Sequence, residues 1–550
     1  MTSGERTMTE GSIGARPAAT GGAYTEADRR QDVQVLHSMG YAQELERRMR
    51  AFSNFAVSFS IICILSGAIN SLAQATAGAG GASIGVGWPL GCLISGVFAL
   101  AMGQIASSYP TAGGLYHWGS ILGNRFTGWL TAWLNLLGLV TVLGAINVGT
   151  WGFFSGAIAP WFPSIAVDTS TAEGFRNQIV FVGLITAVQA LVNHFGIRLT
   201  AKLTDFSGYL IFAGTIALTI ACFAFAEHWD VSRLWTFDNF SGEATYNAAN
   251  ELKGDPVWPN KVSGLMVFML SLLVPIYTIT GYDASAHTSE ETHRAALSAP
   301  RGMANSVWWS SLFGYVMLVG FLFVIPDMKE AARQGWNVFF WALDQRFLAW
   351  LKNALYVAIF VSQFLCGLAT VTSASRMIFA FARDGGLPGW SFLRKVSPRY
   401  RTPNVAIWTA SVLAVAFVWG ASLVTIGGST AYSIVVSCTV IFLFFSFAIP
   451  IGLALMAYGK TWTKMGPWDL GAPIFKLVAV LSILSALLIF FIGVQPPNDW
   501  ALWITVGFLI STAVVWVAFE QRRFKGPPIG DQIAKRQVEI AAAESAIRKA

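Results

Sequence analysis

Charged residues are scarce in this sequence. Of its 550 residues, 12% are Asp, Glu, Lys or Arg and 54% are hydrophobic, whereas about 25% of a soluble globular domain is charged. The mean hydropathy is +0.55. This shortage of charge excludes an ordinary soluble domain and indicates a protein whose helices lie in a lipid bilayer.

Residues that bind metals or carry acid–base chemistry are also few. The chain has five cysteines and six histidines. The cysteines all fall in apolar segments without metal-ligand spacing, where a small buried side chain packs well. We therefore expect no metal and no cofactor. A membrane enzyme would need a cluster of acids, histidines or metal ligands, but only His287 lies deep beside an acid. A channel would need a filter or a ring of like charges, and the sequence contains neither motif.

Long apolar stretches dominate what remains. A helix needs roughly 20 apolar residues to cross about 30 Å of hydrocarbon, and about twelve stretches meet this criterion. They lie at approximately 52–75, 83–107, 126–158, 177–194, 203–226, 263–288, 303–325, 354–382, 404–420, 429–457, 473–494 and 500–519. Residues 1–50 are polar, without an apolar region before a cleavage site, so we expect no cleavable signal peptide. A short amphipathic helix is expected at Leu36–Arg50.

The basic residues are distributed unequally between the two sides of these spans. If both termini lie on one side, the opposite loops hold only eight of the 36 Lys and Arg residues. The positive-inside rule then predicts cytoplasmic termini and an even number of crossings. The expected location is the plasma membrane, in which the protein would be multi-pass. Because the basic residues are dispersed among short loops, nucleic acid is not an expected partner.

The first ten spans divide into two sets of five. In each set the leading helix carries glycine and polar residues at mid-membrane, and the third helix is unusually long. An odd number of helices per set gives the second set inverted topology. We thus predict an all-α polytopic fold with a five-plus-five inverted repeat and discontinuous helices 1 and 6. The expected domains are a tail at 1–50, repeats at 51–226 and 227–457 with an outer loop at 227–262, two further helices at 458–520, and a tail at 521–550.

Ser66-Gly67-Ala68 marks the predicted break in the first span. A half-helix that begins here would direct free N–H groups and its positive dipole end into the membrane midplane, which favours a carboxylate. Ser66 is a candidate N-cap, and Gly67 allows close backbone approach. Helix packing is the alternative explanation, since small residues are common where membrane helices touch.

Thr280-Gly281 marks the predicted break in the sixth span. Here one half-helix would end and expose carbonyl groups, which suit an ammonium group. Tyr277 lies one turn earlier and is a candidate aromatic lid or cation–π partner. An ordinary buried aromatic explains it equally well.

Asp283 is the only acid inside the sixth span. A carboxylate in the membrane is costly, so it is a functional candidate by default. The favoured interpretation is that its side chain caps the second half-helix. The second is a proton or gating group, and the third is a partner for a cationic substrate. His287 lies on the same helical face. Glu290 and Glu291 follow one turn later, where a solvated helix end is the favoured interpretation.

Hydroxyl groups in the eighth span offer a possible cation site. Thr372 and Ser373, together with carbonyl groups of the first break, have the oxygen ligands that Na⁺ prefers. Hydrogen bonding of these hydroxyls to the carbonyls of their own helix is the commoner explanation.

Several segments resemble one permease family. Tyr109–Tyr116 (YPTAGGLY) is similar to the first cytoplasmic signature of the amino acid–polyamine–organocation permeases. Gly281–Thr292 (GYDASAHTSEET) resembles the sixth-helix signature of their amino acid/choline transporter branch. Arg376 with Ala382–Pro388, and Arg401–Asn404, resemble segments of that branch at the end of the eighth span and the entry to the ninth. The resemblance covers roughly residues 36–520.

The resemblance implies a carrier for an amino acid, 4-aminobutyrate, a polyamine or choline. It also implies that Ser66 and Gly67 hold the substrate carboxylate and that Thr280 and Gly281 receive its amine. Gln104 stands where relatives usually carry glutamate, which puts any role for a charge there in doubt.

By resemblance Tyr277 falls at an aromatic gate, and Asp283 matches an acid linked to gating. The expected function is transport by alternating access with H⁺ coupling; Na⁺ symport and exchange of choline or polyamines are alternatives, and a channel or a membrane enzyme is a more distant one. The sequence does not identify the solute, because the half-helix contacts suit any amino acid.

Overall fold

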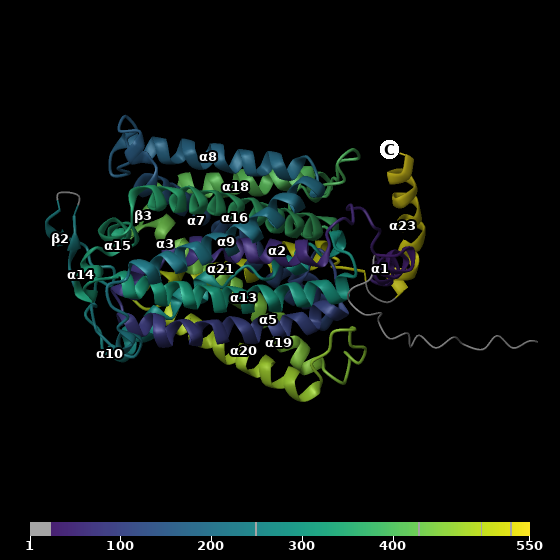
Figure 1. Cartoon of the computed structure of the whole chain (residues 1–550). Coiled ribbons are helices and arrows are strands. Elements are labelled where there is room, and N and C mark those ends of the chain that lie inside the picture. Colours follow the sequence, from purple (N-terminus) through teal and green to yellow (C-terminus); the bar gives the residue numbers. More distant parts are fainter. Residues whose placement is uncertain (1–23, 248–249, 427–428, 497, 529–530, 550) are drawn as a thin grey trace, which may run out of the picture.

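The computed structural model describes residues 24–247, 250–426, 429–496, 498–528 and 531–549. Within these residues eleven helices are long and apolar enough to cross a membrane, and a shorter apolar helical segment covers Gly264–Thr278. Together they match the predicted spans. The chain is an all-α polytopic membrane protein, and its only described strands form two short hairpins (Figure 1).

The helices follow the predicted order. The first half contains α1 (Glu26–Ser38), α2 (Ala51–Ile62), α3 (Ile64–Asn70), α4 (Leu72–Thr76), η1 (Ser83–Gly87), α5 (Trp88–Ser108), α6 (Leu115–Leu122), α7 (Arg125–Ala157), η2 (Ala159–Trp161), α8 (Ala172–His194) and α9 (Ile197–Phe225). The loop that follows holds η3 (Val231–Leu234) and the antiparallel strands β1 (Thr245–Tyr246) and β2 (Leu252–Gly254).

The second half repeats this pattern of long helices and short connections. It contains α10 (Gly264–Ser271), α11 (Leu273–Thr278), α12 (Ala284–His287), η4 (Ser289–Glu291), α13 (Ala295–Val324), α14 (Met328–Arg333), η5 (Gly335–Asn337), α15 (Val338–Arg346), α16 (Ala349–Arg383), α17 (Trp390–Leu393), α18 (Asn404–Ser422), β3 (Thr425–Ile426), β4 (Ser429–Thr430) and α19 (Ala431–Ala457). The chain ends with α20 (Ala472–Gly493), α21 (Trp500–Val515), η6 (Trp516–Glu520), α22 (Gln521–Arg523) and α23 (Asp531–Lys549).

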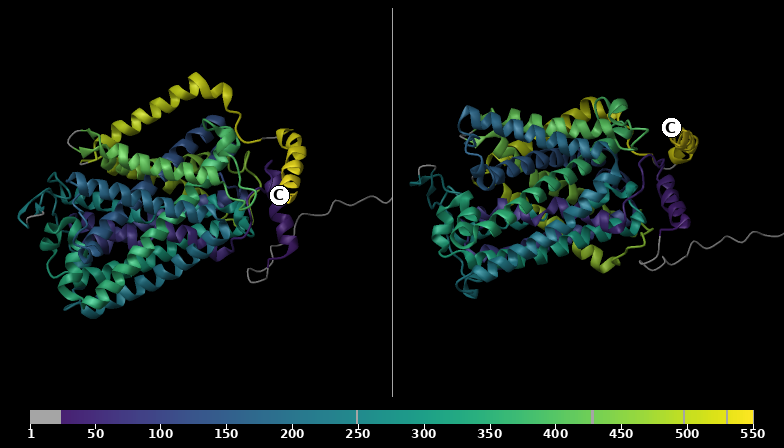
Figure 2. Two further views of the ribbon diagram at one scale, coloured as in Figure 1. Left: turned by 90° about the horizontal axis from the view of Figure 1, so that it is seen from above. Right: turned by 45° about the horizontal axis from the view of Figure 1, so that its top comes forward.

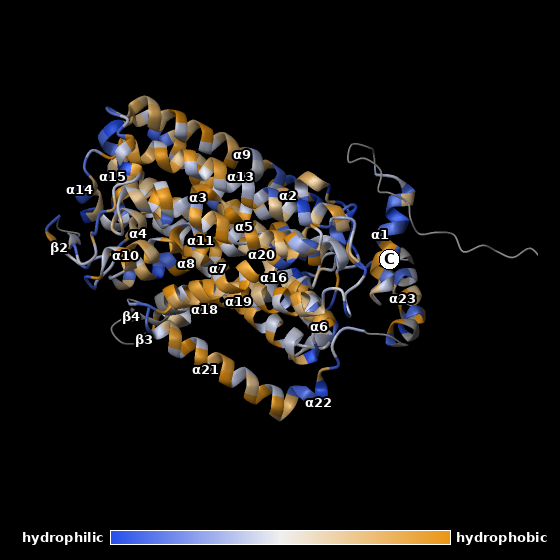
Figure 3. Ribbon diagram, turned by 90° about the horizontal axis from the view of Figure 1, so that it is seen from below, coloured by the Kyte–Doolittle hydropathy of each residue, from blue (hydrophilic) through white to orange (hydrophobic). Residues whose placement is uncertain are grey.

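The interrupted first span lies at the centre of the bundle. In its apolar window 89% of the residues are buried, against 17% in the span that contains α21. Helix α2 packs against α9, α13 and α16. Helix α21 lies at the edge (Figure 2) and is largely hydrophobic (Figure 3), and several of its apolar side chains are exposed. An outer helix exposes such side chains where it faces lipid, so the discontinuous span is the one most enclosed by protein.

The first break lies at Cys63, three residues before the predicted position. Cys63 adopts a left-handed conformation with φ of 33°. Its carbonyl oxygen accepts hydrogen bonds from the N–H groups of Ser66 (2.7 Å) and Gly67 (2.9 Å). Ser66 therefore lies inside the first turn of α3, and the prediction that it caps this half-helix is wrong.

The second break lies where the sequence predicts it. Helix α11 ends at Thr278, and the chain does not become helical again until Ala284. Gly281 has φ of +99°, a conformation that disfavours any residue with a Cβ atom. A Cβ atom at this position would also lie 2.3 Å from Ile61 Cγ2, so a glycine is required twice over.

The two breaks lie side by side in the structure. A Cβ atom on Gly67 would lie 2.9 Å from Thr278 Cγ2 and 3.0 Å from Thr278 Cα, so α3 and α11 approach closely at this glycine. Below them, Ser58 of α2 donates a hydrogen bond to the Tyr282 carbonyl (2.8 Å), and Asn54 donates one to the Ser285 carbonyl (2.9 Å). These bonds satisfy backbone groups that the second break exposes.

Helices α1 and α23 pack together at one end of the bundle (Figure 1). His37 of α1 and Glu544 of α23 approach to 2.8 Å. The predicted helix at Leu36–Arg50 is wrong in position, because the helix ends at Ser38 and residues 41–50 are irregular. The Arg294 guanidinium, with hydrogen bonds from Thr25, holds the pKa of Asp28 in α1 well below its usual range.

Gln104 has a structural role in α5. Its side-chain amide donates to Asp469 Oδ1 (2.6 Å) and its oxygen accepts from the Leu470 N–H (2.9 Å). An ionised glutamate at this position would have no N–H group to donate to Asp469. The amide of glutamine can therefore bind the loop between α19 and α20 through both of its polar atoms.

Candidate functional site

A cavity of about 250 Å³ lies at the two breaks. Its walls come from α2 and α3, α7, α11 and the residues after it, α16, α19 and α20. It extends to Asn498 and to Trp336 of η5. η5 connects α14 to α15, which lie at the end of the bundle opposite α1 and α23 (Figure 1). The predicted breaks in the first and sixth spans thus line one cavity, to which the third, eighth, tenth and eleventh spans also contribute.

Most of the predicted site residues line this cavity. They are Ser66, Gly67, Tyr277, Thr280, Gly281 and Asp283. Ala68 is fully buried and, among the described residues, is not part of the lining. His287, Thr372 and Ser373 are likewise buried away from it.

The cavity wall also includes polar residues that the sequence analysis missed. Asn70 lies one turn beyond Ser66 on α3, and its amide approaches Ser66 Oγ at 3.5 Å. Ser71 donates to the Gly67 carbonyl (2.5 Å), and Gln74 lies farther out. Asn70 and Ser71 lie four residues after Ser66 and Gly67, respectively, and Gln74 lies four residues after Asn70, so all three lie on the same helical face, a signal present in the sequence. The remaining wall is mostly apolar, as in other small-molecule sites.

Asp283 is the only charged residue among the described residues of the lining. It is 1% exposed. The prediction that its side chain caps α12 is wrong, because it makes no capping hydrogen bond. One oxygen instead accepts a hydrogen bond from Asn135 of α7 (3.3 Å) and lies 3.3 Å from His287 Nε2. That nitrogen makes no hydrogen bond of good geometry among the described residues. The Asp283 carboxylate and the His287 imidazole are therefore close but not hydrogen-bonded to each other.

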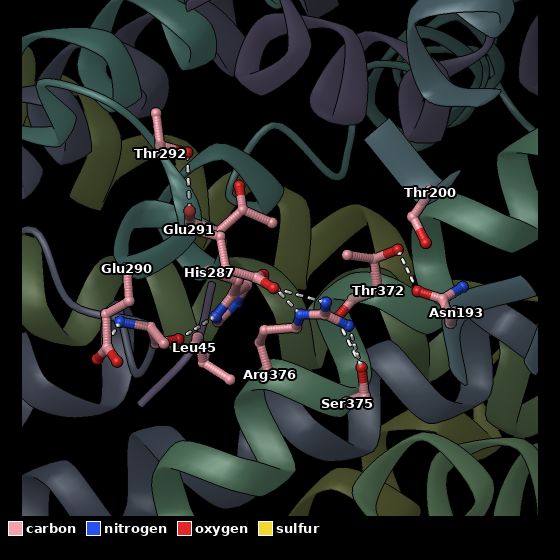
Figure 4. A network of polar contacts seen from close by, with 12 residues as sticks. Leu45, Asn193, Thr200, His287, Glu290, Glu291, Thr292, Thr372, Ser375 and Arg376 are labelled. Carbon is pink, nitrogen blue, oxygen red and sulfur yellow. Dashed lines mark hydrogen bonds and ion pairs between the residues drawn. The ribbon is translucent and has the colours of Figure 1, made fainter. Parts of the chain in front are cut away.

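Two buried ion pairs hold the segment that follows His287, and Figure 4 shows one of them, Glu291 with Arg376. Glu291 receives two hydrogen bonds from Arg376 of α16, at 2.8 and 2.9 Å. Glu290 receives two from Arg383, at 3.0 and 2.8 Å. Both glutamates are 0% exposed. The expectation of a solvated helix end is therefore wrong: these acids join the sixth span to the eighth.

The histidine is connected to the same ion pairs through the backbone. His287 Nδ1 lies 3.1 Å from the Ala112 carbonyl oxygen, and the Ala112 N–H donates to Glu290 (3.0 Å). Burial raises the pKa of Glu290, but the Arg383 guanidinium and the Ala112 N–H outweigh burial and hold that pKa below its ordinary value.

The segments that carry the family resemblance meet at this closed end. Asp384, after α16, accepts hydrogen bonds from Tyr41 (2.7 Å) and Tyr116 (3.1 Å) and lies 3.3 Å from His117 Nε2. Burial lowers the pKa of His117 even though Asp384 opposes this shift. Arg401 donates to backbone carbonyls of the segment before α2, including Gln43 (2.8 Å). The motifs therefore build one closure beneath the cavity.

The hydroxyl groups proposed for sodium lie in a different environment. Thr372 donates to Asn193 Oδ1 of α8 (2.8 Å; Figure 4) and contacts the Leu368 carbonyl (3.1 Å). Ser373 Oγ is buried and has no hydrogen-bond partner among the described residues. The sequence analysis did not predict a role for Asn193 at this site.

The arrangement suits a small dipolar solute. The start of α3 and the end of α11 bring helix ends of opposite partial charge to one cavity. Within the described residues no group of three or more His, Cys, Asp or Glu could hold a metal ion.

Comparisons with known proteins agree with this geometry. Residues 51–519 match a family model described as amino acid permease. The chain is 29% identical to the amino-acid permease BAT1 of Arabidopsis thaliana over 90% of this chain and 95% of that protein. It is 24% identical to amino-acid permease 2 of Neurospora crassa (90% and 88% covered) and 26% identical to a putative polyamine transporter of Candida albicans (90% and 89% covered).

Proposed function

The chain belongs to the amino acid permease family, and from this premise we propose that it is a secondary carrier that moves an amino acid by alternating access. The observation that supports the proposal most strongly is the convergence of two interrupted spans on one cavity that contains a single carboxylate among its described lining residues. Broken helices are tolerated inside a membrane where they line a protein cavity, and paired breaks are typical of transporter substrate sites.

The two ends of a zwitterion would bind at different breaks. In this proposal the solute carboxylate lies at the start of α3, beside Ser66 and Gly67, and Ala68 supports the turn from behind. Its ammonium group lies at the end of α11, near the carbonyls of the Thr280–Gly281 segment and below Tyr277. The last carbonyls of a helix have no partner within that helix, and they carry its negative dipole end.

A polyamine or choline is the alternative substrate class. Asp283 is the only charged residue of the described lining, so a solute with one more positive charge than an amino acid would find a counter-charge there. The Candida albicans relative named as a putative polyamine transporter is consistent with this alternative.

We propose H⁺ as the coupling ion, carried by Asp283 with His287. The carboxylate lines the cavity and the imidazole lies 3.3 Å below it, so a proton on this pair would respond to solute in the cavity and to the closure beneath it. If Na⁺ drives transport instead, Thr372 and Ser373 are the candidate ligands. Thr372→Val would then abolish sodium-dependent uptake, and intact sodium dependence would exclude this alternative.

The pairs Glu291–Arg376 and Glu290–Arg383 are the proposed inner gate. They close the end that carries α1 and α23, while the cavity extends toward the other end. In this proposal the protein lies in the plasma membrane with both termini in the cytoplasm. A structure closed at the end that carries the termini is then outward-directed or occluded. Inward release would require both pairs to separate.

Counterflow in proteoliposomes tests the proposed function. Vesicles loaded with one unlabelled amino acid or amine are diluted into the labelled compound, across a panel that includes 4-aminobutyrate, choline and polyamines. A carrier accumulates label transiently through exchange. Ion conductance without counterflow would indicate a channel, and product formation an enzyme; either result would overturn the proposal.

Gly67→Leu tests the place of binding. Its side chain would meet Thr278 at α11, so counterflow should be abolished while the protein still inserts. Gly183→Leu is the matched control, because a Cβ atom there meets nothing within 4 Å. Unchanged counterflow by a well-folded Gly67→Leu protein would refute the site.

A further inference from the structure

A second, larger cavity lies outside the permease site, at the end of the bundle that carries the terminal helices. It has a volume of about 1310 Å³ and is bounded by α1, the segment before α2 and the first turns of α9. Eight Lys and Arg residues line it against four carboxylates. We call this cavity the basic groove.

The four carboxylates of the basic groove already have partners within the protein. Glu46 pairs with Arg48 (2.6 Å), and Glu26 lies 3.6 and 3.7 Å from two arginines of α1. Glu544 contacts His37. Asp205 accepts a hydrogen bond from Ser53 (3.0 Å) and interacts electrostatically with Arg50.

Two cations of the basic groove remain unmatched. Arg198 and Lys202 are exposed and four residues apart on α9, so they share one helical face. Among the described residues neither has an ion-pair or hydrogen-bond partner. Arg401 also lines the groove, and its guanidinium donates to three backbone carbonyls rather than to a carboxylate. The groove therefore carries an uncompensated positive charge.

The same face of α9 becomes apolar immediately beyond Lys202. Phe206 and Tyr209 lie four and seven residues farther on and are 52% and 62% exposed. Tyr209 stacks on Phe52 of α2, with ring centroids 4.9 Å apart. Helix α9 is long and apolar enough to cross a membrane, so these exposed rings would face lipid directly beyond the basic pair.

We propose that the basic groove binds the headgroup of an anionic phospholipid, with Arg198 and Lys202 on its phosphate and an acyl chain along Phe206 and Tyr209. Clusters of basic residues at the membrane surface attract anionic lipids. The paired cations are followed directly by exposed aromatic rings on the same helical face. A lipid could contact both, whereas a soluble anion would contact only the cations. The groove contacts α1 and the start of α2, so the lipid would bind against the helix that carries the first break. This inference does not depend on which solute is carried.

Ligand-dependent thermal stability of the purified full-length protein in detergent tests the proposal. A ligand that binds only the folded protein raises its apparent Tm. Dioctanoyl phosphatidylglycerol should raise the Tm in a saturable manner, whereas dioctanoyl phosphatidylcholine, with the same chains and no net charge, should not. In Arg198→Gln/Lys202→Gln the half-saturating concentration should rise roughly tenfold or more.

Lys460→Gln/Lys464→Gln is the matched control. These exposed lysines lie in the loop between α19 and α20, outside the basic groove, and their removal should leave phosphatidylglycerol binding unchanged. Equal stabilisation by phosphatidylcholine, equal binding by the Arg198/Lys202 variant, or equal stabilisation by inorganic phosphate alone would each overturn the proposal. The last result would identify a soluble-anion site instead.

Discussion

At the scale of single residues, Gly281 shows how closely the two breaks depend on each other. Its φ of +99° and the 2.3 Å that would separate a Cβ atom from Ile61 Cγ2 act together. Gly281→Ala should destabilise the protein by more than about 1 kcal/mol, since alanine is strained at positive φ and has no room here. We expect a lower apparent Tm and loss of uptake.

Gly389→Ala separates the two effects at Gly281. Gly389 also has a positive φ, of +68°, but a Cβ atom there meets nothing within 4 Å. Gly389→Ala should lower the apparent Tm only by the cost of placing alanine at a positive φ, and its uptake should be unchanged. Equal Tm values and equal uptake for the two alanine variants would show that the contact with Ile61 is unimportant.

Asp283 is the residue on which the coupling proposal depends. Asp283→Asn keeps the shape and one acceptor oxygen but cannot release a proton. The uptake of the parent should fall as the external pH rises, because fewer protons are then available to drive transport, and this dependence should be flattened in the variant. Glu173→Gln, at an exposed position outside the site, is the control. A pH profile identical to that of the parent would remove Asp283 from the coupling mechanism.

At the scale of elements, the ion pairs between η4 and α16 hold the sixth and eighth spans together. Glu291→Gln would leave Arg376 buried without its counter-charge, and breaking a buried pair in this way costs about 3–5 kcal/mol. The apparent Tm should fall strongly. Glu291→Gln/Arg376→Gln should be less destabilised than the sum of its single variants, because neither residue then retains an unpaired charge. Additive losses would show that the pair does not act as a unit.

The discontinuous helices show what an element's sequence can and cannot reveal. Glycine and polar residues at mid-membrane are sufficient to predict which spans are broken, and Gly281 marks the second break. The first break lies three residues before its predicted position, because its left-handed residue is Cys63, which has no intrinsic preference for that conformation. Its position is set by packing, with Gly67 against Thr278 of another helix. Sequence periodicity does not encode such a contact.

At the scale of the whole molecule, apolar length and charge asymmetry predict the membrane fold and its spans. The closure at Glu290 and Glu291 is not predictable in the same way. Acids at the end of a helix are usually solvated, and only the folded chain brings Arg383 and Arg376 to them from a segment more than eighty residues away. The exposed or buried state of a charge depends on these distant partners. The boundaries proposed for the two repeats, at residues 226 and 457, remain predictions.

Solute protection of a cysteine in the cavity tests most directly whether the two breaks hold the transported solute. Asn70→Cys places a thiol on the cavity wall. The five native cysteines are buried, but Cys366 also lines the cavity, so both labelled proteins carry Cys366→Ala. Ser170→Cys, on an exposed loop, is the control outside the cavity. The solute identified by counterflow should slow modification of the thiol at position 70 only, with half-protection at the concentration that gives half-maximal exchange. A solute that is transported but leaves both labelling rates unchanged would show that it binds elsewhere.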